Sequence, residues 1–123
     1  MSKGLEKIVA SLELCKQIPG GEFAESALVW ARNISPINGR VLLPRVDTRR
    51  DVIYQYIICP APTLAEIWRE LRNLSVNVID GTITVSCRID PEETLYETAR
   101  DDNGVTAAAL RLWLKLKEIE VKS

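Results

Sequence analysis

The stretch VNVIDGTITVSCRI, residues 76–89, carries the clearest structural signal in the chain. Two runs rich in β-branched residues flank Asp80-Gly81, a pair that favours the two-residue turn of a β-hairpin. We therefore predict two antiparallel strands at these positions. Because a hairpin needs further elements to bury its apolar face, the segments on either side of it decide the fold class.

A helix is predicted directly before this hairpin, at residues 63–71. Thr63 and Glu66 match the Thr-x-x-Glu capping box that begins many helices. The preceding segment CPAP, residues 59–62, predicts an extended exit from a strand, because each proline biases the residue before it toward extended geometry. The stretch from Cys59 to Trp68 is therefore interpreted as a strand-to-helix corner.

The remaining segments show helical or strand-like patterns in turn. Apolar residues recur at helical spacing over residues 3–17, and Pro19-Gly20-Gly21 would end that helix. Asp90 and Pro91 indicate the start of a short helix over residues 90–102. Strands are predicted at residues 26–34, 40–44 and 52–59, with a turn at Asn38-Gly39 and a polar loop at residues 45–51.

The last predicted helix, residues 105–120, has two apolar stripes. The wider stripe comprises Val105, Ala108, Ala109, Leu112, Leu116 and Ile119, and the second comprises Ala107, Leu110 and Leu114. A surface helix needs only one apolar face, so the second stripe predicts a second neighbour. That neighbour could be another helix of the same chain or a partner protein, and the second stripe is therefore a candidate interface.

The order of these elements predicts the fold class. A helix is followed by strands, a second helix, a hairpin and further helices. This order favours one α+β domain over residues 1–123, with a small antiparallel or mixed sheet and helices packed on one of its faces.

The composition excludes several classes of function. The chain of 123 residues has no histidine, which excludes His-based acid–base catalysis and most catalytic zinc sites. Its three cysteines lie far apart without C-x-x-C spacing, which favours free thiols in a reducing cytoplasm. Cys59 lies about one turn before a helix N-terminus, a position that favours a thiolate, but it ends an apolar run and has no histidine as a base. We expect it to be a structural cysteine.

The same patterns indicate no catalytic residue, cofactor or metal site, and we predict that the protein is not an enzyme. No run of about 18 apolar residues indicates a membrane span. Asp101 and Asp102, with Glu97 one turn earlier, could attract a hard cation, but their spacing does not match a calcium loop. Asp102 or Asn103 is better explained as the cap of the last helix.

Charge is unevenly distributed although the net charge is −1. One region is basic and holds Arg32, Arg40, Arg45, Arg49 and Arg50 against the single acid Asp47. A second region is acidic and holds Asp80, Asp90, Glu92, Glu93, Glu97, Asp101 and Asp102 against Arg88 and Arg100. Arg40, Arg45, Arg49 and Arg50 are candidate contacts for phosphate or nucleic acid, although an exposed loop that pairs with acidic neighbours is the better explanation.

Three blocks of the sequence resemble a set of small proteins from gut bacteria of the Bacteroides group and from their phages and mobile elements. The blocks are LELCKQIPGGEFAESALVW at residues 12–30, CPAPTLAEIWREL at residues 59–71 and AAALRLWLKLKE at residues 107–118. The resemblance implies no activity and no catalytic residue. A phage or mobile-element origin would imply a cytoplasmic accessory protein.

Two functions are compatible with these observations. The first is a small cytoplasmic accessory or interaction protein that acts through surface contacts or self-association, with a protein partner and no membrane. The alternative is a nucleic-acid-associated accessory protein that uses the arginine-rich loop, whose binding would weaken steeply with salt.

Overall fold

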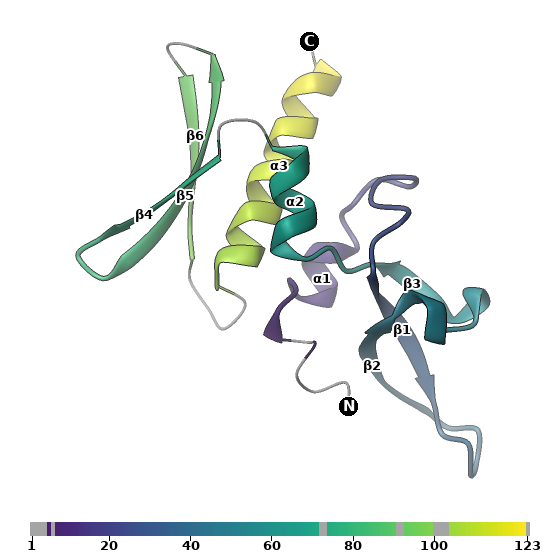
Figure 1. Ribbon diagram of the computed structural model, residues 1–123. Helices are drawn as coiled ribbons and strands as arrows, with labels where there is room; N and C mark the ends of the chain where they lie inside the picture. Colours follow the sequence, from purple (N-terminus) through teal and green to yellow (C-terminus); the bar gives the residue numbers. More distant parts are fainter. Residues whose placement is uncertain (1–4, 6, 72–73, 91–92, 100–103, 123) are drawn as a thin grey trace.

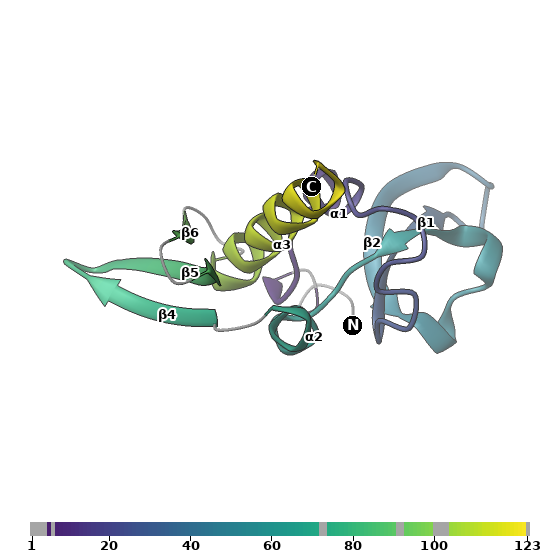
Figure 2. The ribbon, with the colours of Figure 1, turned by 90° about the horizontal axis from the view of Figure 1, so that it is seen from above.

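The computed structural model describes residues 5, 7–71, 74–90, 93–99 and 104–122. Within these residues the protein has two three-stranded antiparallel sheets with the helices between them (Figures 1 and 2). The predicted α+β class is confirmed, but two sheets replace the single sheet that we expected. The strands are β1 Leu28–Ile34, β2 Val41–Thr48, β3 Ile57–Pro60, β4 Leu74–Ile79, β5 Thr82–Asp90 and β6 Glu93–Thr98, and the helices are α1 Leu12–Cys15, α2 Leu64–Glu70 and α3 Gly104–Lys122.

The two sheets are ordered β2-β1-β3 and β4-β5-β6. The hairpin predicted at residues 76–89 is confirmed as β4 and β5, which pair antiparallel with Val76 opposite Val85. Asp80 and Gly81 both have positive φ, +51° and +77°, as a tight hairpin turn requires at its two central positions. This local turn therefore sets the register of the second sheet.

The helix predicted at residues 63–71 is confirmed as α2, and its capping box is complete. The Thr63 side chain accepts a hydrogen bond from the Glu66 N–H at 3.3 Å, and Glu66 Oε1 accepts one from the Thr63 N–H at 2.8 Å. Two donors at the helix start are thus satisfied by local side chains, which is why a four-residue motif was sufficient to predict the boundary.

One apolar core joins both sheets to the helices. Trp30 and Val46 contribute from the first sheet, Val85 from the second, and Ile67 from α2, and all four are buried. The largest share comes from α3, through Ala107, Ala108, Ala109, Leu110, Leu112 and Trp113. The α3 helix packs against β5, β6 and α2, so it is the central element of the fold. None of the helices among the described residues combines the length and the apolarity that crossing a bilayer requires.

The long helix predicted at residues 3–17 is wrong for the part that the structure describes. Only α1, four residues long, is α-helical, and it begins after Ser11, whose Oγ caps it by accepting a hydrogen bond from the Leu14 N–H at 3.4 Å. Val9 instead forms an isolated antiparallel bridge with Thr63. The apolar pattern correctly indicated burial, since Val9 and Cys15 are both buried. However, the bridge to Thr63, 54 residues later in the chain, holds the backbone extended at Val9.

The limits of the first sheet also differ from the prediction. The polar loop predicted from residue 45 begins as strand, because β2 continues to Thr48 with Val46 buried opposite Trp30. Conversely, the strand predicted at residues 52–59 contains a 3-10 turn at Tyr54–Tyr56, and β3 starts only at Ile57. In β2 a single inward residue between polar neighbours is enough to make a half-buried strand.

The helix predicted over residues 90–102 is wrong. Asp90 ends β5, and residues 93–98 form β6, which pairs antiparallel with β5. Pro91 and Glu92 lie outside the described residues. Along β6 the inward positions Leu95 and Glu97 lie opposite Cys87 and Val85, on the face that α3 covers. Pairing with a neighbouring strand therefore overrode the local helix-start signal.

Candidate functional site

The β1–β2 hairpin extends away from the helices and from the second sheet (Figure 1). The predicted turn at Asn38-Gly39 is confirmed: Gly39 has a φ of +70°, and its N–H donates to the Ser35 carbonyl at 2.9 Å. Beyond an irregularity at residues 31–33, Asn33 pairs with Leu42 and Ile34 with Val41. We call residues 34–43 the hairpin tip.

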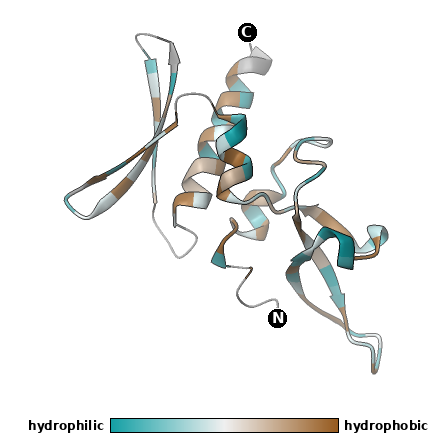
Figure 3. Cartoon of the chain, in the orientation of Figure 1, coloured by the Kyte–Doolittle hydropathy of each residue, from teal (hydrophilic) through white to brown (hydrophobic). Residues whose placement is uncertain are grey.

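The hairpin tip carries a concentration of exposed aliphatic side chains. Ile37, Val41 and Leu43 are 92%, 81% and 86% exposed, and Ile34 and Leu42 are also exposed. Figure 3 shows hydrophobic segments alternating with hydrophilic ones along the hairpin. Scattered exposed aliphatic residues are normal on a protein surface, but several on one small hairpin make it a candidate interaction surface.

The four arginines proposed as anion contacts are placed in different ways. Arg49 is engaged with its own chain: Nε donates to the Ser26 carbonyl at 2.8 Å, and Nη2 donates to Ser26 Oγ at 2.9 Å and to the Phe23 carbonyl at 3.4 Å. These bonds fix the loop before β1, so Arg49 has a structural role.

Arg45 is also engaged with the hairpin. Its Nη1 donates to Asn33 Oδ1 at 3.3 Å, and its Nε lies 3.5 Å from Asp47 Oδ2, an ion-pair distance without hydrogen-bond geometry. Arg40 and Arg50, by contrast, are exposed. The structure therefore separates the four candidate arginines into two that are anchored, Arg45 and Arg49, and two that face solvent, Arg40 and Arg50.

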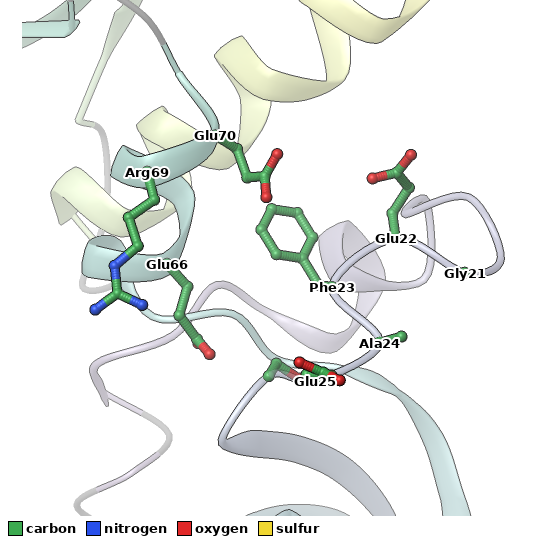
Figure 4. Close-up of a pocket in the computed structure, with 9 residues that line it drawn as sticks. Gly21, Glu22, Phe23, Ala24, Glu25, Glu66, Arg69 and Glu70 are labelled. Atoms are coloured by element: carbon green, nitrogen blue, oxygen red, sulfur yellow. The ribbon is translucent and has the colours of Figure 1, made fainter.

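A hollow of about 510 Å³ lies between α2 and the loop before β1. Figure 4 shows the Phe23 ring pointing from this loop toward Glu70 of α2, with Glu22 and Glu25 on the same loop and Glu66 on α2. The lining consists of Gly21, Glu22, Phe23, Ala24, Glu25, Ser26, Glu66, Arg69 and Glu70. Four glutamates against one arginine leave a formal charge of −3, and we call this feature the acidic hollow.

Two residues that line the acidic hollow, Phe23 and Glu22, contact side chains of α3. The Phe23 ring lies 4.8 Å from the ring of Trp113, at an interplanar angle of 51°. Glu22 lies 3.8 Å from Lys117 of α3. Glu25 and Glu70 are exposed at the rim. No sequence signal pointed to this feature, since its two sides are about 40 residues apart in the chain.

Glu66 connects the two sides of the acidic hollow. Besides its capping bond, its Oε2 accepts a hydrogen bond from the Ala27 N–H at 3.0 Å, which joins α2 to the residue before β1. We expect Glu66→Ala to lower the free energy of unfolding by about 2 kcal/mol, because two backbone donors lose a charged acceptor. Glu70→Ala, one turn later and exposed, should change it by less than about 0.5 kcal/mol. Urea unfolding of both variants measures the difference, and equal losses would contradict the assignment.

The three cysteines are free thiols. Cys15 and Cys87 are buried, and Cys59 is half-buried in β3, where it pairs with Trp30. Burial raises the pKa of Cys59 to about 11, although Lys16 acts in the opposite direction. Burial, with a smaller contribution from Cys59, raises the pKa of Cys15 to about 12, against a hydrogen bond from Trp30 that lowers it. Neither thiol has the lowered pKa of a reactive cysteine.

We therefore expect Cys59 to react slowly with thiol reagents in the folded protein. At about pH 8 its rate should be a few hundredfold below that of a free thiol with a pKa near 8.5, because so little thiolate is present. The rate should rise about tenfold per pH unit up to the pKa of about 11. The urea-unfolded chain is the control and should react quickly at all three cysteines, whereas a fast thiol in the folded protein would refute this expectation.

The second stripe of the last helix faces the interior of the chain. Ala107 and Leu110 are buried, and Leu114 is partly buried against the core. The α2 helix and the second sheet supply neighbours for α3. Packing within the chain thus accounts for Ala107 and Leu110 without a partner protein.

The acidic residues near the end of β6 are only partly described. Asp101, Asp102 and Asn103, the residues considered for a cation site and for the helix cap, lie outside the described residues. Glu97 is buried and forms ion pairs with Arg111 and Lys115 of α3. Among the residues that the structure describes, no three His, Cys, Asp or Glu side chains are grouped as metal ligands.

Comparison of the chain with family models found no match, and comparisons with curated proteins and with solved structures likewise found none.

Proposed function

We propose that this protein is a small accessory protein that acts by binding other protein surfaces, and that the hairpin tip is its contact surface. The observation that carries the proposal is the exposure of Ile37, Val41 and Leu43 on one projecting hairpin. Aliphatic side chains that remain in water at such a site gain free energy when a partner covers them.

We further propose that the protein acts in the cytoplasm. Three cysteines that form no disulfide support this location, since free thiols persist in reducing compartments. A phage or mobile-element origin remains a proposal that rests on the three sequence blocks at residues 12–30, 59–71 and 107–118. The genes adjacent to this one in its host would test it.

Site-specific photocrosslinking in the native host tests the contact surface. A photoreactive residue at Ile37 should give a discrete protein adduct, and the adduct should disappear when Val41 and Leu43 are changed to serine. A photoreactive residue at Val78, which is exposed on β4, is the matched control and should give no such adduct. Since all these positions are exposed, the changes should leave stability within about 0.5 kcal/mol. Identical adduct patterns from Ile37 and Val78 would refute the proposal.

Nucleic-acid binding through the basic region is the second candidate. Arg40 and Arg50 face solvent and support it, whereas the internal hydrogen bonds of Arg45 and Arg49 leave fewer guanidinium donors for phosphate. A mobility shift at low salt that disappears at high salt and in the Arg40→Ala, Arg50→Ala variant would favour this function. No shift at low salt would exclude it.

A further inference from the structure

We infer that the hairpin tip of one copy binds the acidic hollow of a second copy, so that the protein associates head to tail. The inference rests on the proposed function in one respect: the hairpin tip must be a protein contact surface. It adds that the partner is a second copy of this chain and that the binding site on this second copy is the acidic hollow.

The first hairpin carries apolar side chains both in the core and beyond it. At its base, Trp30 and Val46 are paired with each other and buried in the core. By the alternation of side chains along β1, Ile34 lies on the same side as Trp30, with the exposed Arg32 between them, and it pairs with Val41. The aliphatic side chains of the tip therefore form a separate surface that is exposed to solvent. A partner that covers the tip must offer apolar surface of its own.

Charge restricts the partner further. The β1–β2 hairpin, Leu28–Thr48, holds three arginines against one acidic residue, Asp47. Asp47 pairs with Arg45, whereas Arg32 and Arg40 are exposed. Two hairpin tips packed against each other would bring these like charges together, which is unfavourable at an interface. The tip therefore favours a surface that is acidic as well as apolar.

The acidic hollow has both properties. Its volume of about 510 Å³ lies within the range of roughly 300–1,000 Å³ that is typical of ligand pockets and can admit side chains of a partner. Phe23 and Ala24 provide apolar lining, and Glu25 and Glu70 are exposed where an incoming arginine could reach them. The two exposed arginines of the hairpin, Arg32 and Arg40, are opposite in sign to the formal charge of −3 on the hollow lining.

One molecule cannot make this contact with itself. Ser26 lines the hollow, and β1 leads away from it, starting at Leu28. At about 3.3 Å per residue, the seven residues of β1 place the tip roughly 23 Å from that point. The tip and the hollow are thus at opposite ends of one hairpin (Figure 1). A contact between two different patches is heterologous, so repeated association gives rings or filaments.

The experiment uses two complementary variants and light scattering coupled to size exclusion. The tip variant carries Ile37→Ser with Arg40→Ser, and the hollow variant carries Glu25→Lys with Glu70→Lys, so that the altered tip gains no charge that the altered hollow would attract. The wild-type protein should increase in mass with concentration, and more so at low salt. Each variant alone should remain a monomer, with association weakened at least about tenfold. Their mixture should form a heterodimer and nothing larger, because one functional tip and one functional hollow remain.

Three results would overturn the inference. They are a wild-type protein that is monomeric at every concentration, a hollow variant that still self-associates, and a mixture that remains monomeric. Unchanged circular dichroism and melting temperature in both variants exclude unfolding as the cause. If the wild-type protein is monomeric while Ile37 crosslinks to another protein, the second copy is the wrong partner and the proposed function survives. If Ile37 gives no adduct either, both fail.

Discussion

Replacement of Trp113 by alanine should lower the free energy of unfolding by about 4 kcal/mol, the largest loss that we expect from a single change in this chain. Trp113 is 1% exposed and lies in the middle of α3, the helix that packs against α2 and the second sheet. Its removal leaves a cavity in a densely packed core and takes away the ring on which Phe23 packs. The Lys117 ammonium, 5.4 Å from the centre of the same ring, also loses its contact.

The matched control for Trp113 is Trp68 of α2, a helical tryptophan that is 43% exposed. Trp68→Ala should cost clearly less, about 2 kcal/mol, because nearly half of the Trp68 surface is already in water. Urea unfolding followed by circular dichroism measures both variants without relying on tryptophan fluorescence. Similar losses from the two substitutions would show that α3 is not the centre of the core.

Replacement of Glu97 by glutamine should cost about 2 kcal/mol near neutral pH. Glu97 is 8% exposed on β6, and its Oε2 accepts a hydrogen bond from Arg111 Nε at 3.2 Å. Lys115 forms a second ion pair with it, and Arg111 Nη2 also donates to the Thr98 carbonyl at 2.9 Å. Removing the one carboxylate leaves two cations without their partner. Since Lys115 is half-exposed, the cost is below that of a fully buried pair.

The same residue predicts a dependence of stability on pH. Burial raises the pKa of Glu97, but hydrogen bonds and charge from Lys115 and Arg111 outweigh burial and hold the pKa below its ordinary value. A lowered pKa in the folded state stabilises the protein above the unfolded value, near 4.3, and this stabilisation is lost as the pH falls through the folded pKa. The difference between wild type and Glu97→Gln should therefore shrink in acid. A difference that is constant from neutral to acidic pH would contradict the ion-pair explanation.

The correct predictions concern elements whose signals lie within a few residues. The β4–β5 hairpin depends on the positive φ of Asp80 and Gly81, and the start of α2 depends on bonds between Thr63 and Glu66. The last helix could be predicted because its apolar residues recur over five turns. In each case the deciding interaction joins residues that are close in sequence, so the order of the residues is sufficient to predict it.

The wrong predictions share the opposite property. Residues 93–98 follow a good helix-start motif, yet they form β6 because β5 offers a row of backbone partners and Glu97 finds cations on α3. Val9 has a helical pattern around it but is held extended by Thr63. Local preferences of this kind amount to less than about 1 kcal/mol per residue, and a few distant backbone or ionic contacts outweigh them.

In the candidate site, too, local features could be predicted from the sequence and contacts between distant residues could not. The sequence by itself determined the α+β class, the hairpin turns at Asn38-Gly39 and Asp80-Gly81, the capped α2 and the basic character of the first hairpin, because charge and turn geometry are properties of neighbouring residues. Only the tertiary structure decided that Leu110 is buried while Ile37 is exposed, that Arg49 anchors a loop, and that Glu25 and Glu70 share a hollow. The exposure of a side chain and its distance from other side chains depend on which distant segments pack together. The local sequence around an aliphatic residue is the same whether that packing buries the residue or leaves it in water.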